Sequence, residues 1–398
     1  MALAETLCPG VGRGRADGEA LVAPLTQSTT FRRDSVGSEA LHQYSRVSNP
    51  TVATLERALG DLERALPAAC FSTGLAAETA LFLATLRAGD HVVCGRSVYG
   101  GTTRLLERLL PGLGIEASFA DATDAAQVRG ALRDTTRLVF LETPSNPTLE
   151  LTDIRACAGA AREVGALVAV DNTFLTAALQ QPLDLGADVS VYSTTKFVEG
   201  HSVALGGALV TRDAALLERI RFVRKCTGSI QTPFHAWLTI NGLKTLALRI
   251  GRQSASAAAI AHWLADRPEV ARVHHPSLAT GAQGEIARAQ HLAGHGGVVS
   301  FEVRGGIAAA RALTERVELC ALVEHVGSVD TLLTHPATMT HADVAPYARR
   351  AAGIGDGLLR LSVGLEPVES ILTDLDHGLA AAGACAAREE VAACDASL

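Results

Sequence analysis

The sequence lacks several features that would place it at once in a known class of protein. Its formal net charge of −7 and its pI near 6.0 leave no basic surface of the kind that binds nucleic acid. No uninterrupted apolar stretch is long enough to span a membrane, because runs such as Ala166–Val170 end at polar residues. The first residues, Met1–Thr6, contain no basic region followed by an apolar segment, so no secretory signal is expected. We therefore expect a cytoplasmic protein that binds neither nucleic acid nor membranes.

Cysteine and histidine motifs are also missing. The eight cysteines include no C-x-x-C pair, which argues against a zinc site and against a disulfide framework. The thirteen histidines, among them His291 and His295, show no spacing typical of metal ligands, so we expect no bound metal. What is present is the composition of a globular chain, with 48% hydrophobic and 19% charged residues, and its 398 residues are enough for two domains.

The first fifty residues show little periodicity. They are rich in Gly, Arg, Thr and Ser, and we expect an extended arm over residues 1–50 that ends at Asn49-Pro50. A helix is expected from about Thr51, because apolar residues then recur at helical spacing at Val52, Leu55, Leu59, Leu62 and Leu66.

Short apolar runs then alternate with amphipathic stretches, which favours a parallel sheet with helices on both faces. The expected strands are His91–Cys94, Arg137–Leu141, Leu167–Val170, Val189–Tyr192 and Ala208–Thr211. Beyond about Asn241-Gly242, longer helical patterns accompany strand-like runs at Val298–Val303 and Leu359–Val363, which is typical of a smaller α+β domain. We expect a main domain over residues 51–242 and a C-terminal domain over residues 243–398.

The most informative stretch surrounds Lys196. A hydrophobic strand is followed by hydroxyl residues three and one positions before the lysine, and then by a glycine turn, in the run Asp188-Val-Ser-Val-Tyr-Ser193-Thr-Thr195-Lys196-Phe-Val-Glu-Gly200-His201-Ser202. Such hydroxyls can hold a phosphate while the ammonium stays within reach of an aldehyde. Covalent attachment of pyridoxal phosphate (PLP) to a protein requires this arrangement. A solvated surface lysine is the alternative.

At every position this run resembles the lysine signature of the Cys/Met-metabolism PLP enzymes, a family that holds cystathionine γ-synthases, cystathionine γ-lyases and methionine γ-lyases. The resemblance extends from about Leu21 to Ala380, with the main motifs in the family's order. It implies an aspartate-aminotransferase-like α/β fold, PLP fold-type I, with a mostly parallel sheet domain and a smaller C-terminal α+β domain. It also implies that Lys196 binds PLP and removes the α-proton of the substrate.

Several residues near the carboxyl ends of the expected strands match cofactor-binding residues of the family. In Ser72-Thr73-Gly74-Leu75, the backbone N–H groups of Gly74 and Leu75 begin a helix, and the family uses this segment as its phosphate cradle. A plain N-cap is the alternative. Ser193 and Thr195 are the hydroxyl residues expected at the same phosphate.

Asp171 ends an apolar run and opens the string Asp171-Asn-Thr173-Phe, which matches the family at each residue. A buried carboxylate at this place keeps the pyridine nitrogen protonated, and the resemblance adds Thr173 to the cofactor site. A strand-end cap is the alternative for Asp171.

Two further residues are assigned to the cofactor by the resemblance. Asn146, within Ser145-Asn146-Pro147, matches the residue that contacts the phenolic oxygen, and it also borders the substrate. Tyr99, within Tyr99-Gly100-Gly101, matches the tyrosine that stacks on the pyridine ring and takes part in proton transfer. A proline-rich turn and a core tyrosine are the respective alternatives.

Tyr44 and Arg46 resemble the Y-x-R motif of the family's N-terminal arm, which reaches the PLP phosphate of a neighbouring subunit. A guanidinium group suits a phosphate well because it donates two parallel hydrogen bonds. The resemblance therefore implies a homo-oligomer, namely a homotetramer built from catalytic dimers. A solvated charge on a mobile arm is the alternative for Arg46.

The residues expected at the substrate are less uniform. Arg360 matches the arginine that binds the α-carboxylate in the family, with a structural ion pair as the alternative. Glu324 matches a glutamate of cystathionine-handling members, whereas the next residue, usually Ser, is His325 here. The sequence also departs from the family at three other positions. Val203 stands where the family usually has an aspartate, and Asn241 stands where it commonly has an arginine. Gly101 stands where methionine γ-lyases have a cysteine.

We therefore expect a PLP-dependent γ-replacement or γ-elimination on an activated homoserine- or cystathionine-like amino acid. The main alternative is a γ-lyase or γ-synthase of specialised metabolism that acts on a non-standard 4-substituted amino acid, such as a halogenated one. An aminotransferase and a PLP-binding protein without turnover are further alternatives. Retention of Lys196 and Tyr99 argues against the latter. The sequence does not choose between replacement and elimination, nor does it identify the leaving group or the nucleophile.

Overall fold

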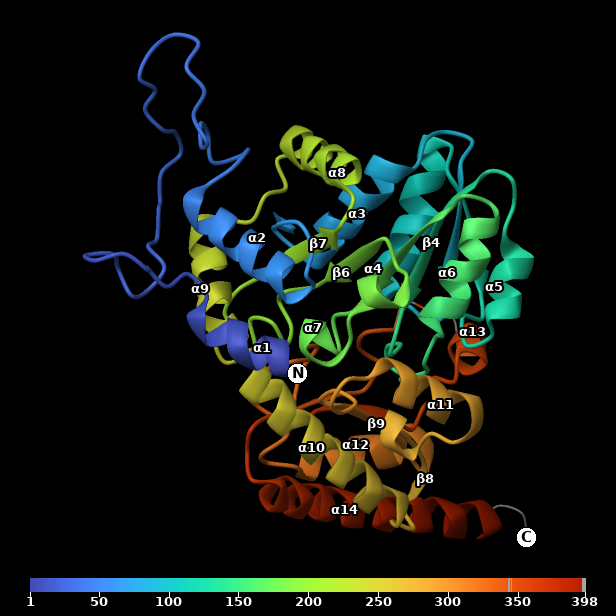
Figure 1. The fold of residues 1–398 in the computed structure, drawn as a ribbon. Helices are drawn as coiled ribbons and strands as arrows, with labels where there is room; N and C mark the ends of the chain where they lie inside the picture. The colour runs from blue at the N-terminus through green and yellow to red at the C-terminus, as the bar shows by residue number, and fades with distance from the viewer. Residues whose placement is uncertain (343, 345, 396–398) are drawn as a thin grey trace. The chain divides into compact units, whose positions relative to one another are not determined.

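The computed structural model of the chain describes residues 1–342, 344 and 346–395. The chain forms two compact units, and each is treated by itself below. The first unit comprises Met1–Thr143 and Thr152–Leu248, and the second comprises Pro144–Leu151 and Arg249–Leu398 (Figure 1).

The first unit is built on a seven-stranded sheet. Its strands are β1 (Ala69–Phe71), β2 (His91–Gly95), β3 (Glu116–Ala120), β4 (Thr136–Glu142), β5 (Leu167–Asp171), β6 (Val189–Tyr192) and β7 (Gly207–Thr211). They lie in the order β1-β7-β6-β5-β4-β2-β3. The run from β3 to β6 is parallel, whereas β7 is antiparallel to both of its neighbours, β6 and β1.

Helices connect most of these strands. Asn49 begins one of them, because its side-chain oxygen accepts a hydrogen bond of 2.9 Å from the Thr51 N–H and Pro50 fills the first helical position. The helical elements of the unit are α1 (Ala2–Leu7), η1 (Cys8–Gly10), α2 (Pro50–Leu62), α3 (Gly74–Thr85), α4 (Gly100–Arg104), η2 (Leu105–Leu109), η3 (Leu110–Leu113), α5 (Ala125–Ala131), α6 (Ile154–Glu163), α7 (Thr176–Leu179), η4 (Pro182–Leu185), α8 (Ala214–Thr227) and α9 (Pro233–Leu243).

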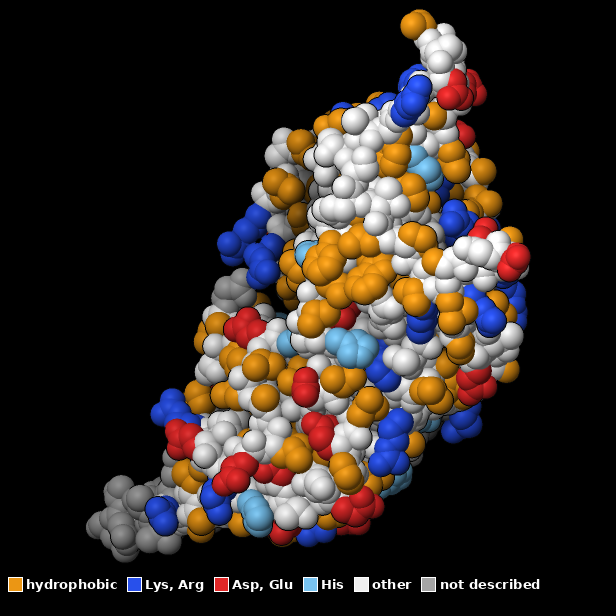
Figure 2. Space-filling view, turned by 90° about the vertical axis from the view of Figure 1, so that its left-hand side faces the viewer, with side chains coloured by type: hydrophobic (Ala, Val, Ile, Leu, Met, Phe, Trp, Pro, Cys, Tyr) orange, Lys and Arg blue, Asp and Glu red, His pale blue; other side chains and the backbone are white. Residues whose placement is uncertain are grey.

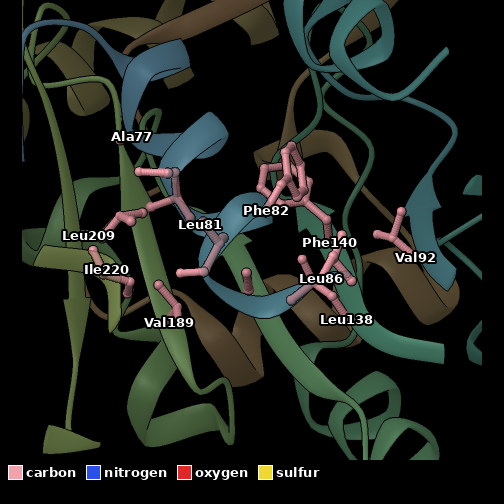
Figure 3. Packing of buried hydrophobic residues seen from close by; sticks show 14 of the residues in the cluster. Ala77, Leu81, Phe82, Leu86, Val92, Leu138, Phe140, Val189, Leu209 and Ile220 are labelled. Atoms are coloured by element: carbon pink, nitrogen blue, oxygen red, sulfur yellow. The ribbon is translucent and has the colours of Figure 1, made fainter. Parts of the chain in front are cut away.

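The sheet is buried on both faces, as the continuous apolar runs predict. Side chains alternate along β4, so that Leu138 and Phe140 join a core with α3 and α8, while Val139 and Leu141 join a second core with α5 and α6. Figure 3 shows the first core, in which the rings of Phe82 and Phe140 lie 5.5 Å apart between their centroids. Burial on both faces is typical of a parallel α/β sheet.

The predicted strands of this unit are confirmed, with one difference in direction and two omissions. The strand expected at Ala208–Thr211 forms β7, but it runs antiparallel, because the loop from Ser193 to Gly206 returns the chain without a crossover helix. Strands β1 and β3 were not predicted. β1 has three residues, and β3 is a partly exposed edge strand whose sequence has little apolar character.

The expectation of an extended arm over the first fifty residues is wrong at its beginning. Residues 2–10 form α1 and η1, which bury Ala4 and Cys8, and α1 packs against α2 and α7. Six residues are too few to show a helical period in the sequence. The rest of the segment has no helix, and in Figure 1 it loops away from the other elements of its unit (blue).

The second unit contains a five-stranded sheet in the order β10-β11-β12-β9-β8. Its strands are β8 (Val270–His274), β9 (Val298–Val303), β10 (Ala321–Leu322), β11 (Leu332–Thr334) and β12 (Leu358–Ser362). All pairs are antiparallel except β10 with β11. The helical elements are α10 (Leu246–Ala265, mostly in this unit), η5 (Pro276–Leu278), α11 (Gly281–Gln290), α12 (Gly306–Arg316), α13 (Pro346–Ala351) and α14 (Val368–Asp395).

This unit confirms the predicted α+β pattern. Both predicted strands are present, as β9 and β12, and α12 packs against the long helix α14. Phe301 and Leu361 from the sheet meet Leu313 and Leu375 from these helices in a single core. None of the helices within the described part of the chain has the length and apolar character needed to cross a membrane.

Three histidines, His275, His291 and His295, cluster in the second unit. The Nδ1 atoms of His291 and His295 lie 2.8 Å apart, and the rings of His275 and His295 meet edge to face. Burial, reinforced by the neighbouring histidines, lowers the pKa of His275 and of His291 to about 3. Burial also lowers the pKa of His295.

Acid should therefore destabilise the protein. A lowered pKa means that the folded chain binds fewer protons than the unfolded chain, so this contribution is present above about pH 6.5 and is lost as the pH falls. Below that pH, we expect the free energy of unfolding to fall by up to about 1.4 kcal/mol per pH unit for each such histidine, measured by urea unfolding. His291→Leu should weaken the pH dependence, and His377→Gln, at an exposed position of α14, should not. Equal pH dependence in all three proteins would contradict this.

Candidate active site

The loop after β6 carries Lys196 close to the sheet. The Lys196 N–H donates to the Ser193 carbonyl at 3.2 Å, and the Gly200 N–H donates to the Lys196 carbonyl at 2.8 Å. These bonds hold the loop in tight turns directly after β6, at the carboxyl end of that strand. The side chain of Lys196 is partly buried.

The first turn of α3 lies against this loop. A Cβ atom on Gly74 would be 2.9 Å from the Ser193 Cβ, so only glycine allows the two segments to come this close. The Thr73 hydroxyl caps the Ala76 N–H at 3.0 Å, which leaves the N–H groups of Gly74 and Leu75 in the first helical turn, where no backbone acceptor is available. The predicted phosphate cradle and the predicted hydroxyl loop therefore meet.

The two hydroxyls before the lysine differ in their surroundings. Thr195 Oγ1 accepts a hydrogen bond of 2.9 Å from the Gly206 N–H and donates one of 3.1 Å to the Gly206 carbonyl. The Thr195 hydroxyl proton is thus used to hold the loop to the start of β7. The Ser193 hydroxyl makes no hydrogen bond with the residues that the structure describes, so it is the one able to donate to an anion.

Asp171 lies at the end of β5 and is 8% exposed. Its Oδ1 accepts a hydrogen bond of 2.9 Å from the Thr173 N–H, and Thr173 Oγ1 accepts one of 2.8 Å from the Ser193 N–H. A short chain of bonds therefore connects the carboxyl group to the hydroxyl loop. Burial raises the pKa of Asp171, while the hydrogen bonds from Thr173 lower it.

These residues fit PLP. A buried carboxyl group whose pKa is raised by desolvation gains from a protonated partner, which the pyridine nitrogen would be. The helix N-terminus at Gly74, together with the Ser193 hydroxyl, suits a phosphate group. Lys196 comes three residues after Ser193 on the same loop.

Tyr99 is held from two sides. Its N–H donates to Glu142 Oε2 at 2.6 Å, and its ring packs over Gly101. A Cβ atom on Gly101 would be 2.5 Å from Tyr99 Cε1 and 2.9 Å from the methyl groups of Leu75. Tyr99 as a whole residue is 39% exposed, which argues against the alternative of a core tyrosine.

Sequence reasoning missed the buried acids of this region. Glu142 is the last residue of β4, and Glu78 lies on α3, where its Oε2 accepts a hydrogen bond of 2.7 Å from the Thr102 hydroxyl. Both glutamates are buried. The sequence did contain a signal for them, because each glutamate is a charged residue among apolar ones in a strand or a helix. Acids are rarely buried at such positions unless they have a partner.

The arm residues Tyr44 and Arg46 lie elsewhere in the unit. Arg46 Nη1 donates to the Lys225 carbonyl at 2.8 Å, near the C-terminus of α8, and its Cζ lies 5.5 Å from the centroid of the Tyr44 ring. Both side chains are exposed. The structure does not join them to Lys196 within one chain.

In the second unit, Arg360 on β12 is buried and organises three segments. It donates to Asn146 Oδ1 at 2.9 Å, to the His325 carbonyl at 3.0 Å and to Thr334 Oγ1 at 3.0 Å. These three acceptors are neutral groups. The structure therefore brings three of the predicted substrate residues together, Arg360, Asn146 and His325.

The remaining predicted positions are more exposed. Glu324 is exposed and precedes the partly buried His325. Val203 is 58% exposed, and its N–H donates to the buried Glu199 at 3.2 Å. Across the described ranges, no group of three or more His, Cys, Asp or Glu residues is arranged to hold a metal ion.

Comparison with protein families gives one match that covers nearly the whole chain. Residues 7–380 match the family described as Cys/Met metabolism PLP-dependent enzyme. The chain is 42% identical over 361 residues to cystathionine gamma-synthase of Mycobacterium tuberculosis, covering 90% of this chain and 92% of that protein. It is 40% identical over 387 residues to O-succinylhomoserine sulfhydrylase of Pseudomonas aeruginosa, covering 95% of each chain.

Solved structures agree with these matches. The chain is similar to cystathionine gamma synthase from Xanthomonas oryzae pv. oryzae in complex with aminoacrylate and cysteine, with a TM-score of 0.92 and 41% identity over 97% of this chain and 99% of that one. The predicted fold class, an α/β PLP fold with a large sheet and a smaller second sheet, is confirmed.

The packing of Tyr99 over Gly101 predicts the effect of a side chain at that position. In Gly101→Ala, the new methyl group should displace the Tyr99 ring, and the loss of stacking should weaken PLP binding by roughly 2- to 10-fold, measured by titrating the apoenzyme. Gly130→Ala is the matched control, because nothing lies within 4 Å of its added methyl group. Equal PLP affinity in both variants would show that Gly101 does not position the ring.

Proposed function

The chain belongs to the Cys/Met metabolism PLP-dependent enzymes, which use PLP for γ-replacement or γ-elimination, and we propose that its substrate is an activated homoserine- or cystathionine-like amino acid. The observation that carries this proposal is the meeting of Gly74, Ser193, Lys196 and Asp171 at the carboxyl ends of β5 and β6 and at the first turn of α3. This is the place where α/β sheets bind ligands.

The relatives give no support to the alternative substrate class. None of those named above carries a name that points to a halogenated or other non-standard 4-substituted amino acid. The same relatives are enzymes, which removes the alternative of a PLP-binding protein without turnover. Synthases and lyases are both found among the relatives at similar sequence identity to this chain. A cystathionine gamma-lyase of Bacillus subtilis, for example, is 39% identical to it over 360 residues.

The first unit would hold the cofactor through its phosphate and its ring. The N–H groups of Gly74 and Leu75 and the hydroxyl of Ser193 would bind the phosphate, while Thr195 secures the loop that carries Ser193. Asp171 would hold a proton at the pyridine nitrogen, and Thr173 would orient the Asp171 carboxylate. When bound, PLP withdraws electrons from the substrate carbon that loses its proton.

Lys196 and Tyr99 are the residues that we assign to proton movement and stacking. Lys196 would hold the cofactor through its amine and would act as the base that takes the proton from the substrate Cα. Tyr99 would stack on the cofactor ring, with its backbone held by Glu142 and its side chain packed over Gly101. Positioning of this kind accounts for a large share of catalysis in well-oriented systems.

The second unit would supply the substrate contacts. Arg360 binds the α-carboxylate, and Asn146 contacts both the cofactor and the substrate, as their mutual hydrogen bond of 2.9 Å supports. Glu324 and His325 are assigned to substrate selection. The His325 carbonyl supports the Arg360 guanidinium group at 3.0 Å, so its side chain is carried next to the carboxylate site.

We further propose a homotetramer of catalytic dimers in which the helix-free part of the arm, residues 11–49, enters the site of a neighbouring subunit. Tyr44 and Arg46 would then bind the phosphate there. Large apolar side chains on the arm are exposed, including Leu21 at 67% and Leu41 at 87%, as expected of a segment that another copy covers. Figure 2 shows hydrophobic side chains gathered near the middle of the face viewed there.

A cytoplasmic location is proposed on the basis of the cysteines. Every cysteine whose state the structure gives is a free thiol, including the exposed Cys226. Free exposed thiols are typical of reducing compartments.

A substrate panel tests the proposed function. Cystathionine and O-acetyl-, O-succinyl- and O-phosphohomoserine should be consumed, giving a thioether when a thiol is added, or a 2-oxo acid and ammonia without it. Lys196→Ala should lower turnover by at least about 10²- to 10⁴-fold. Borohydride followed by peptide mapping should label Lys196. Lys225→Ala, at an exposed position, is the control. Turnover of none of these compounds, or a label on Lys225 or Lys244, would contradict the assignment.

Mixing of variant subunits tests the shared site. Arg46→Ala should weaken PLP binding, and Lys196→Ala should be inactive. Denaturing and refolding them together should restore activity to part of the oligomers, because one site then receives both an intact Arg46 and an intact Lys196. If the mixture is no more active than the two variants alone, the arm does not cross between subunits.

A further inference from the structure

Two buried carboxyl groups hold the segment that carries Tyr99. Glu142 accepts the Tyr99 N–H at 2.6 Å, and Glu78 accepts the hydroxyl of Thr102 at 2.7 Å. Glu78 is 3% exposed and Thr102 is fully buried. The Glu142 bond acts directly on Tyr99, whereas the Glu78 bond acts three residues further along the chain.

Thr102 connects directly to Tyr99 through the backbone. The N–H groups of Thr102 and Thr103 donate to the Tyr99 carbonyl at 2.9 and 3.2 Å, which forms the first turn of α4. α4 has five residues and continues directly into η2 (Leu105–Leu109) and η3 (Leu110–Leu113), and a helical segment of this total length is only marginally stable by itself in water. Its position therefore depends on what it contacts in the rest of the unit.

α3 contacts α4 through two of its residues, Leu75 and Glu78. Leu75 lies next to Gly101 and the Tyr99 ring, as the Gly101 geometry shows, and Glu78 lies almost one turn further along the same helix. The apolar contact and the hydrogen bond thus attach α4 to the helix whose first turn forms the phosphate cradle.

We propose that Glu78 is a positioning residue of the active site: by accepting the hydrogen bond of the Thr102 hydroxyl, it fixes the first turn of α4 and thereby the direction of the Tyr99 ring. The proposal rests on the proposed function only in assigning that ring to the cofactor.

Glu78 acts as a neutral acceptor. Burial and then the nearby Asp171 raise its pKa to about 8, against the lowering effect of the Thr102 bond. The titratable groups around it are Asp171 on β5 and Cys94 on β2. The pKa of Cys94 is raised by burial first, and then by Glu78 and by Glu142 on β4. With Glu78 protonated at neutral pH, Asp171 does not face a second negative charge. Glutamine reproduces this neutral state and still accepts a hydrogen bond.

Fluorotyrosine labelling of the PLP-loaded enzyme tests the proposal. The chain has four tyrosines, and the resonance missing in Tyr99→Phe identifies Tyr99. Glu78→Leu and Thr102→Val should shift or broaden that ¹⁹F resonance and weaken PLP binding by roughly 2- to 10-fold. Glu78→Gln should retain wild-type values at neutral pH. Thr85→Val is the control, because the Thr85 hydroxyl bonds only within α3, to the Leu81 carbonyl at 2.8 Å.

Infrared difference spectra provide a readout that a purely structural role would not change. The wild-type enzyme at pH 7 should show a protonated carboxyl band that is missing in Glu78→Gln, that shifts in Thr102→Val, and that disappears as the pH is raised past about 8.

Two outcomes would overturn the proposal. One is an unchanged Tyr99 resonance and PLP affinity in Glu78→Leu and Thr102→Val; if Glu78→Leu does not fold, the near-isosteric Thr102→Val decides alone. The other is a Glu78→Gln enzyme as impaired as Glu78→Leu, which would assign the role to a negative charge. Failure of the proposed function is distinguishable, because the wild type would then lack turnover while its Tyr99 resonance still responded to Glu78.

Discussion

The site depends on one steric constraint, the close approach of three backbone segments around the first turn of α3. Gly74 lies against Ser193, and Gly207 lies against the Thr73 carbonyl, with no room for a side chain at either glycine. Because of this contact, the helix N-terminus, the lysine loop and the start of β7 form one rigid structure. The phosphate cradle and Lys196 are therefore positioned together, and Thr195 strengthens the arrangement by bonding to the neighbouring Gly206.

Around this structure, the protein buries acids and controls their charge. Asp171, Glu78 and Glu142 are all buried in the same unit, and burial raises the pKa of the first two. Three ionised carboxylates in such a place would repel each other strongly. A proton on Glu78 removes part of that repulsion and favours a charge on Asp171, the group that we propose for the pyridine nitrogen. One acid thus acts through its charge, and the others act mainly as hydrogen-bond acceptors for the segment that carries Tyr99.

The residues that we propose for the reaction chemistry and for substrate choice lie in different kinds of structure. Lys196 and Asp171 lie at or just after the ends of central strands, where packing on both faces keeps them in place. Glu324 and His325 lie in a loop, and Glu324 is exposed, so they are free to vary without disturbing a core. This difference explains why the family is evident while replacement and elimination are not separated. His325 supports Arg360 through its backbone carbonyl, a group that any residue at this position would provide.

The sequence by itself determined what depends on local order. Apolar runs identified the central strands. The hydroxyl, lysine and glycine spacing indicated Lys196 as the cofactor lysine, and the string Asp171-Asn-Thr-Phe indicated Asp171 through its resemblance to the family. Tertiary structure alone decided the direction of β7, the use of the Thr195 hydroxyl on Gly206, and the bond between Glu78 and Thr102. These contacts join residues separated by loops and helices, and their partners leave no period or spacing in the sequence. A pattern read along the chain reports which side chains share a face, but a hydrogen bond depends on which faces meet.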